Sequence, residues 1–170
     1  MPILTLRTIN SPTLPIPGMD PWHANAGDPA VSVMTSFRER HSVTVPDTMP
    51  IDVALEHMKH TGVRCAFAVD DEGKAVVGLV TAYDIMSEKP IQAAHTKRQD
   101  ILVRDIMQRI SDWRVIHIED LERATVGSVA RLFDETRLTH IPVTETDAKG
   151  HVKVRGLLSS ARVKRLLHHT

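Results

Sequence analysis

The strongest constraint on the fold of this sequence is that it contains the same pattern twice. VSVMT resembles VRDIM, with Met34 and Met107 separated by 73 residues, and SVTVPD matches VIHIED at the same offset. PIDVALEHMKHTGVRCAFAV then matches TVGSVARLFDETRLTHIPV at an offset of 75, and GLVTAYDIM matches GLLSSARVK at 78. The offset grows only in polar, turn-forming stretches, as expected when a duplicated unit lengthens its loops and keeps its elements.

Each copy contains the periodicity of an amphipathic helix. Apolar residues recur at i, i+3, i+4 and i+7, the spacing that aligns side chains on one face of a helix. They are Ile51, Ala54, Leu55 and Met58 in the first copy and Val126, Val129, Ala130 and Phe133 in the second. Pro50 suits the first helical position, and Gly62 suits a left-handed stop. We therefore expect a helix of about three turns in each copy.

Two apolar runs and a second helix follow in each copy. Cys65–Val69 and Ile141–Val143 precede the polar turns DDEGK and TDAKG, and AVVGLV and VKVRGLL come after them. A final helix begins at Thr81 or at Ser159. Two strands joined by a polar turn predict an antiparallel hairpin, with the helices on one face of the sheet. The repeated unit is thus β-α-β-β-α, which places the chain in the α+β (α/β) class.

The composition narrows the function classes. The 170-residue chain has 21 Lys plus Arg and 21 Asp plus Glu, so no excess positive charge favours binding to nucleic acid. Its single cysteine, Cys65, excludes an intramolecular disulfide and a thiolate metal cluster. The scattered histidines do not form a metal-binding motif. No apolar run is long enough for a membrane span, so we expect a cytoplasmic protein without a membrane partner.

The duplicated pattern resembles the CBS domain, and two such units in tandem resemble a Bateman module. The resemblance rests on the VMT and DIM segments, the VTVPD and VIHIED strands, HIPV before the hairpin, and GLVTAYDIM with its weaker copy GLLSSARVK. It implies a stand-alone protein with CBS domains at 29–93 and 103–168 and a linker at 94–102. The prolines concentrated before these domains indicate an extended arm at 1–28, because proline prevents a continuous helix or central strand. In this family the two domains pack with pseudo-twofold symmetry and leave two clefts, which in many members bind AMP, ADP, ATP or S-adenosylmethionine.

The motif Thr81-x-x-Asp84 has two interpretations. A Thr followed three residues later by an acid forms a capping box at a helix N-terminus. The family resemblance implies instead that Thr81 approaches phosphate and that Asp84 binds the ribose hydroxyls. In the second copy the position of the acid is taken by Arg162, which cannot accept a hydrogen bond. We expect one functional cleft and one degenerate cleft, in which Arg162 either binds an anion or is a solvent-facing helical residue.

The resemblance implies further ligand contacts around the cleft. Thr139 and His140 of the second copy, and Arg64 and Cys65 of the first, correspond to positions that point at phosphate. For His140, packing between helices is an equally good interpretation. The adenine is expected against apolar side chains and strand backbone near Thr44, Val45 and Ala66.

These features predict a sensor or regulatory module that binds an adenine nucleotide. We expect no catalytic residues, no metal and no required cofactor, because no nucleophile, base and orienting group can be nominated together. Cys65, on an apolar strand, is expected to be a core residue. The family resemblance implies a homodimer that acts on a protein partner of unknown identity. The alternatives are an interaction or dimerisation module without a ligand, with Thr81 and Asp84 only capping a helix, and a CBS pair that binds S-adenosylmethionine.

Overall fold

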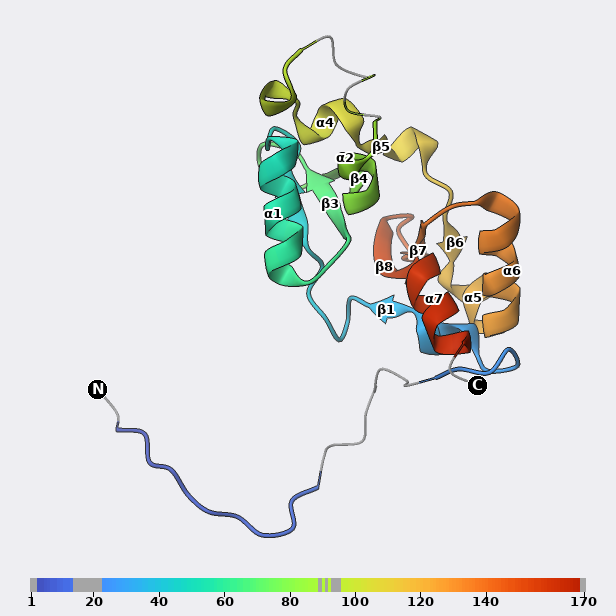
Figure 1. Ribbon diagram of the computed structural model, residues 1–170. Helices are drawn as coiled ribbons and strands as arrows, with labels where there is room; N and C mark the ends of the chain where they lie inside the picture. Colours follow the sequence, from blue (N-terminus) through green and yellow to red (C-terminus); the bar gives the residue numbers. More distant parts are fainter. Residues whose placement is uncertain (1–2, 14–22, 89, 91, 93–95, 169–170) are drawn as a thin grey trace.

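The structure, a computed structural model, contains two β-sheets, each covered by helices on one face (Figure 1). It describes residues 3–13, 23–88, 90, 92 and 96–168. Within these residues the strands form two four-stranded sheets, with the orders β2-β3-β4-β5 and β1-β8-β7-β6. The mixture of helices and sheets confirms the predicted α+β class.

The first sheet carries the hairpin of the first copy. It consists of β2 (Thr44–Pro46), β3 (Cys65–Val69), β4 (Val76–Thr81) and β5 (Gln108–Arg109). Strand β3 is parallel to β2 and antiparallel to β4, as the β-α-β-β-α pattern predicts. The helices are α1 (Ile51–Thr61), α2 (Ala82–Met86) and α4 (Val103–Ile106), with a 3-10 turn, η2, at Arg98–Asp100. The core between α1, α2, α4 and the sheet is apolar and contains Ala66, Ala68 and Val80 of the strands.

The second sheet repeats this arrangement. It contains β6 (Ile116–His117), β7 (His140–Thr146) and β8 (Val152–Ser159), and β1 (Thr35–Ser36) at its edge. Its helices are α5 (Ile118–Glu122), α6 (Val126–Thr136) and α7 (Ser160–Leu167). Two further 3-10 turns, η1 (Ala30–Val33) and η3 (Ile110–Asp112), lie before β1 and after β5. The parallel β6–β7 pair and the antiparallel β7–β8 hairpin match their counterparts in the first sheet.

Helices α1 and α6 confirm the periodicity of the sequence. Each has 11 residues and buries three of its four predicted apolar residues, while Leu55 and Ala130 are half-buried. Gly62 ends α1 in the left-handed region with φ of 74°, which a residue without Cβ adopts at low cost. Pro50 lies one residue before the first helical position, as the N-cap of α1.

The segments that lead into the two copies are exchanged between the sheets. Strand β1, which precedes the first copy, pairs with β8 of the second, and β5, which precedes the second copy, pairs with β4 of the first. Ala30 and Val33 of η1 are fully buried in the core under the second sheet. The ranges 29–93 and 103–168 therefore describe the repeat in the sequence. In the fold, each sheet also includes one segment from the other range.

The two sheets meet through the faces that the helices leave uncovered. Cys65 and Phe67 of β3 and Leu79 of β4 are buried in a third apolar cluster, which includes residues of the lead-in segments and Leu157 of β8. The Phe67 ring lies 5.6 Å from that of Phe37 and 6.0 Å from that of Trp113, measured between centroids. This contact joins the two repeats into one body.

The N-terminal arm contributes to the fold only at its end. Residues 3–13 have no helix or strand and are exposed, with Leu4 and Leu6 95% and 99% accessible. Ala24 is buried in the second core, and its N–H donates to the carbonyl of Leu166 at 3.0 Å. No helix in the described ranges has the length and apolar character needed to cross a membrane.

Candidate ligand cleft between the repeats

The Thr81-x-x-Asp84 motif lies where β4 runs into α2. Thr81 is 2% exposed, and its hydroxyl accepts a hydrogen bond from the N–H of Asp84 at 3.0 Å. Ser159 does the same for the N–H of Arg162 at 3.4 Å in the second repeat. Because the cap uses the hydroxyl and the backbone N–H, it forms equally well with an acid or a base at the fourth position.

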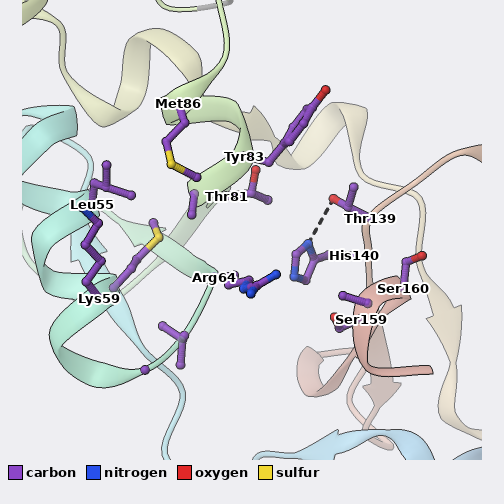
Figure 2. Close-up of a pocket in the computed structure, with 15 residues that line it drawn as sticks. Leu55, Lys59, Arg64, Thr81, Tyr83, Met86, Thr139, His140, Ser159 and Ser160 are labelled. Carbon is purple, nitrogen blue, oxygen red and sulfur yellow. Dashed lines mark hydrogen bonds between the residues drawn. The ribbon is translucent and has the colours of Figure 1, made fainter. Parts of the chain in front are cut away.

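The beginnings of β3 and β7 face this motif from both repeats. Cys65 pairs with Thr81 across the first hairpin, and His140 pairs with Ser159 across the second. Nδ1 of His140 lies 3.1 Å from the hydroxyl of Thr139, as Figure 2 shows. Arg64 and His140 lie side by side in that view, so one arginine and one imidazole from different repeats border the same space.

A cavity of about 720 Å³ occupies this junction. Equivalent residues of the two repeats line it, since Arg64 corresponds to Thr139 and Thr81 to Ser159 in the repeat alignment. Apolar groups from α1 and α2 complete the wall (Figure 2). These groups are Leu55, Met58, Tyr83 and Met86. A volume of this size is typical of small-molecule sites.

The electrostatics place the carboxylate of Asp84 near both repeats. Burial lowers the pKa of His140 to about 4, and the negative charge of Asp84 opposes this shift. Burial also raises the pKa of the Cys65 thiol well above its usual range, and Asp84 adds to that increase. His140 is therefore neutral near pH 7, and Cys65 is a protonated thiol with little nucleophilic character. One carboxylate oxygen of Asp84 is itself buried.

The structure brings part of the predicted site together. Arg64, Thr81, Thr139 and His140 line the cavity. Asp84 lies close enough to His140 to affect its pKa but is not among the residues that line this cavity. Thr44 instead lines a separate cleft of about 770 Å³ beside Phe67 and Trp113.

Val45 and Ala66 differ most from the expectation. Both are fully buried in the core beneath the helices, so their side chains cannot meet a ligand. Because side chains alternate along a strand, β3 presents Cys65 and Phe67 toward the other repeat and Ala66 toward the helices. Only the strand backbone remains available at Ala66.

The sequence analysis missed Tyr83 and Met86. Their side chains are 70% and 64% exposed, and both line the cavity. Large apolar residues usually face a core, so their presence at two outward positions of a short helix was the signal that could have identified them as cavity residues.

Arg162 lies in a third cleft, of about 750 Å³, on the other flank of the junction. His140, Arg64 and Ser159 line both this cleft and the first cavity. Burial lowers the pKa of the Arg162 guanidinium, and the nearby charges of Arg40 and Arg165 lower it further. No group of His, Cys, Asp and Glu side chains among the residues that the structure describes could hold a metal ion.

Comparison with known proteins agrees with this architecture. The profile of the CBS domain family matches residues 30–90, which span the first repeat. The fold is similar to that of CBSX2, a CBS-pair protein from Arabidopsis thaliana that was solved in complex with AMP. The identity to that complex is 26%, with 82% of this chain and 95% of the other covered and a TM-score of 0.54. The first repeat is a CBS domain, and the chain has the fold of a CBS pair.

Two further structures share the CBS-pair fold. The CBS domain pair of protein MJ0100, in complex with 5'-methylthioadenosine and S-adenosyl-L-methionine, is 22% identical, with 78% of this chain and 95% of the other covered and a TM-score of 0.51. A CBS domain protein of unknown function, TA0289 from Thermoplasma acidophilum, is 19% identical, with 79% and 70% covered and a TM-score of 0.55. No curated protein sequence matches the CBS pair.

Proposed function

We propose that this CBS pair is a regulatory module that binds an adenosine compound at the junction of its repeats and catalyses no reaction itself. The observation that carries the proposal is the cavity of about 720 Å³ at the junction, which Arg64 and Thr81 of one repeat and His140 of the other line together. The AMP complex of CBSX2 and the methylthioadenosine complex of MJ0100 support this ligand class.

The residues around the cavity suit the parts of such a ligand. Asp84 lies just outside the cavity lining and near His140, and its carboxylate is the acceptor for two vicinal ribose hydroxyls of a ligand that extends to it. Tyr83 and Met86 offer exposed apolar surface to the base. Arg64 and Thr139 donate to phosphate, whereas His140 contributes as a neutral donor because burial lowers its pKa to about 4.

The charge of the cavity favours a ligand with few phosphates. Arg64 and Lys59 are its cationic lining groups, and Lys59 already pairs with Glu56 at 3.3 Å. One arginine balances the charge of a monophosphate better than that of a triphosphate. We therefore rank AMP above ADP and ATP, and S-adenosylmethionine, which has no phosphate, is the second candidate.

A thermal-shift screen with AMP, ADP, ATP, S-adenosylmethionine and NAD tests the proposal. A ligand at a hundred times its Kd stabilises the folded state by about 2.7 kcal/mol, which raises Tm by roughly 5 to 10 °C in a chain of this size. Asp84→Asn should remove most of the shift, because it replaces an acceptor oxygen and the negative charge. Asp71→Asn, in the exposed β3–β4 turn, is the matched control.

The screen separates the alternatives. If none of the compounds raises Tm, the ligand-free interaction module becomes the better function. A full shift in the Asp84→Asn variant would place the ligand elsewhere. Conversion of any of these compounds during incubation would contradict the non-catalytic role.

We further propose that the CBS pair works in the cytoplasm as a homodimer and transmits ligand binding to a protein partner. Val53 on α1 and Tyr83 and Met86 on α2 expose 52%, 70% and 64% of their surfaces, which is unusual for such residues on a free helical face. A ligand that prefers one arrangement of the two repeats would shift this surface. Sedimentation equilibrium of the protein and of Met86→Lys tests the dimer, which the charged variant should dissociate.

A further inference from the structure

The cleft of about 770 Å³ that Thr44 lines lies at the turn ends of the two hairpins, and we call it the hairpin cleft. Both repeats contribute to it, through residues 74–76 after the β3–β4 turn and residues 152–154 after the β7–β8 turn. Thr81 and Ser159 lie at the opposite ends of β4 and β8. The hairpin cleft shares no lining residue with the proposed adenosine cavity, so it is a separate concavity of the molecule.

Aromatic and branched apolar side chains form most of the wall of the hairpin cleft. The Phe67 ring, in a residue that is only 4% exposed, contacts the half-buried rings of Phe37 and Trp113. Three more large apolar residues that line the cleft expose roughly half of their surface or more. They are Ile110, Val115 and Val152. Exposed apolar groups that gather in one concavity are typical of a ligand site.

The polar groups that the hairpin cleft offers to a ligand are neutral hydroxyls. They belong to Ser42, Thr44, Thr144 and Thr146. Of the two lysines at its border, Lys74 pairs with Glu72 at 3.5 Å. Lys153 pairs across the hairpin with Glu145, on the strand face opposite to that of Thr144. The described residues that line the cleft include no acidic side chain. The cleft therefore suits an uncharged ligand.

Thr144 gives the most direct indication of a ligand. The residue is 7% exposed, and its hydroxyl forms no hydrogen bond with any other residue in the described ranges. Val69 holds the equivalent position of the first repeat, since both residues follow a strand irregularity and pair with a valine, Val76 or Val154. Because valine has nearly the same shape as threonine, packing does not require the hydroxyl, and a buried hydroxyl without a partner is unfavourable. This hydroxyl is available to a molecule in the cleft.

We propose that the hairpin cleft binds an uncharged, planar aromatic molecule with a hydrogen-bond donor and acceptor on its edge. The rings of Phe37 and Trp113 contact the ligand, as aromatic side chains favour aromatic partners. The Thr144 hydroxyl bonds to its polar edge, since a hydroxyl both donates and accepts. A charged ligand binds less well, because its charge would lose water without gaining an ion pair.

Titration of the isotope-labelled full chain with quinolin-2-one, followed by NMR, tests this proposal. This probe is neutral and planar, and one edge carries an N–H and a C=O group. We expect a saturable shift of the indole N–H signal of Trp113, which donates to the carbonyl of Gln108 at 2.9 Å. The chain has two tryptophans, so Trp22→Phe identifies the signal. Quinoline-2-carboxylate, which adds a negative charge to the same ring system, should bind about 10-fold more weakly.

Thr144→Val tests the role of the hydroxyl. It should lower the affinity for quinolin-2-one about 2- to 10-fold, the loss expected for one neutral hydrogen bond. Its Tm should be unchanged or higher, because the first repeat accepts valine at the equivalent position. Thr48→Val, exposed in the turn before α1 and outside every cleft described above, is the matched control and should bind with full affinity.

The hairpin cleft and the adenosine cavity can be tested separately. Asp84→Asn should bind quinolin-2-one as the original chain does, and Thr144→Val should keep any shift of Tm by AMP, so the two proposals fail independently.

Three results would overturn the proposal for the hairpin cleft. One is the absence of a saturable shift of the Trp113 signal, and another is equal or tighter binding of quinoline-2-carboxylate. The third is full affinity in Thr144→Val. A lower Tm of that variant would also count against the proposal, because it would assign the hydroxyl to the stability of the fold.

Discussion

His140 illustrates how one side chain at the junction of the repeats combines structure and function. It opens β7, lies beside Arg64 and Thr139, and lines both the adenosine cavity and the Arg162 cleft. Burial lowers its pKa to about 4, although the charge of Asp84 opposes the shift. The sequence interpretations of a phosphate donor and of a packed histidine are therefore compatible, because the ring is both half-buried and beside the cavity.

The first prediction concerns the pH dependence that His140 imposes on stability. The unfolded state, with a histidine pKa near 6.5, binds more protons than the native state between pH 6.5 and about 4. The free energy of unfolding should therefore fall as pH decreases through that window, by on the order of 2 to 3 kcal/mol from this residue. Urea unfolding at pH 7.0 and pH 4.5 measures the change.

The comparison with His140→Gln isolates this contribution from that of the carboxylates. The variant should lose less stability between the two pH values than the original protein does, because it has no proton to bind at this position. His60→Gln, exposed on α1, should behave like the original protein. Equal pH dependence in all three proteins would mean that His140 titrates normally in the native state.

At the scale of elements, the strands and helices within each copy were predictable and the lead-in segments were not. Periodicity and turn residues are local signals, so α1, α6 and both hairpins followed from the sequence. The exchange of β1 and β5 between the sheets depends on contacts between residues far apart in the sequence, which no local pattern encodes. Thr35 of β1 and Leu157 of β8, for example, are more than 100 positions apart. The matching methionines in VSVMT and VRDIM marked the segments but not their partners.

The prediction of the candidate site was limited in a similar way, because the sequence does not show which face of a buried strand a residue lies on. β3 is buried on both sides, so its sequence CAFAV has no polar alternation to distinguish the two faces. The sequence therefore pointed to β3 at the junction and named Ala66, which faces the helices, together with its neighbour Cys65, but not Phe67. The sequence also named Thr81, Thr139 and His140, and the structure places all three at the junction, where Thr81 ends β4 and Thr139 directly precedes His140, the first residue of β7.

The second prediction concerns the two glycines that accept the exchanged segments. A Cβ at Gly78 would lie 2.6 Å from Sδ of Met107 and 2.9 Å from the carbonyl oxygen of Gln108. A Cβ at Gly156 would lie 2.5 Å from Sδ of Met34 and 2.7 Å from the carbonyl oxygen of Thr35. Gly78→Ala and Gly156→Ala should each destabilise the fold by about 1 to 3 kcal/mol, because backbone as well as side chain must move.

Urea unfolding of the two alanine variants measures that cost. Gly27→Ala is the matched control, since a Cβ there meets no atom within 4 Å. Replacing Met107 by Ala in the Gly78→Ala variant should recover only part of the loss, because the carbonyl of Gln108 remains in place. Unchanged stability in both glycine variants would contradict the close packing of β5 on β4 and of β1 on β8.

For the whole molecule, the exchanged segments make the two repeats depend on each other. The second core contains Ala30 and Val33, and the first contains Val103 and Ile106, all buried. The cluster around Phe67 adds a direct contact between the sheets. Neither repeat as a contiguous range contains the residues that complete its core, so each repeat should lose stability when the other unfolds.

The third prediction is that the CBS pair unfolds in one cooperative transition. In hydrogen-exchange measurements, the slowest amides of β3 and of β7 should have the same free energy of opening, because neither sheet stays folded without the lead-in segment from the other repeat. A fragment of residues 103–168 should be unfolded, as it lacks η1 and β1. Removal of residues 1–22 is the control and should leave the transition unchanged, since the described part of that segment, residues 3–13, is exposed and lies outside both cores. Different opening free energies for the two strands, or a folded 103–168 fragment, would show that each repeat is stable without the exchanged segment. Ligand binding at the junction would then not need to couple the repeats.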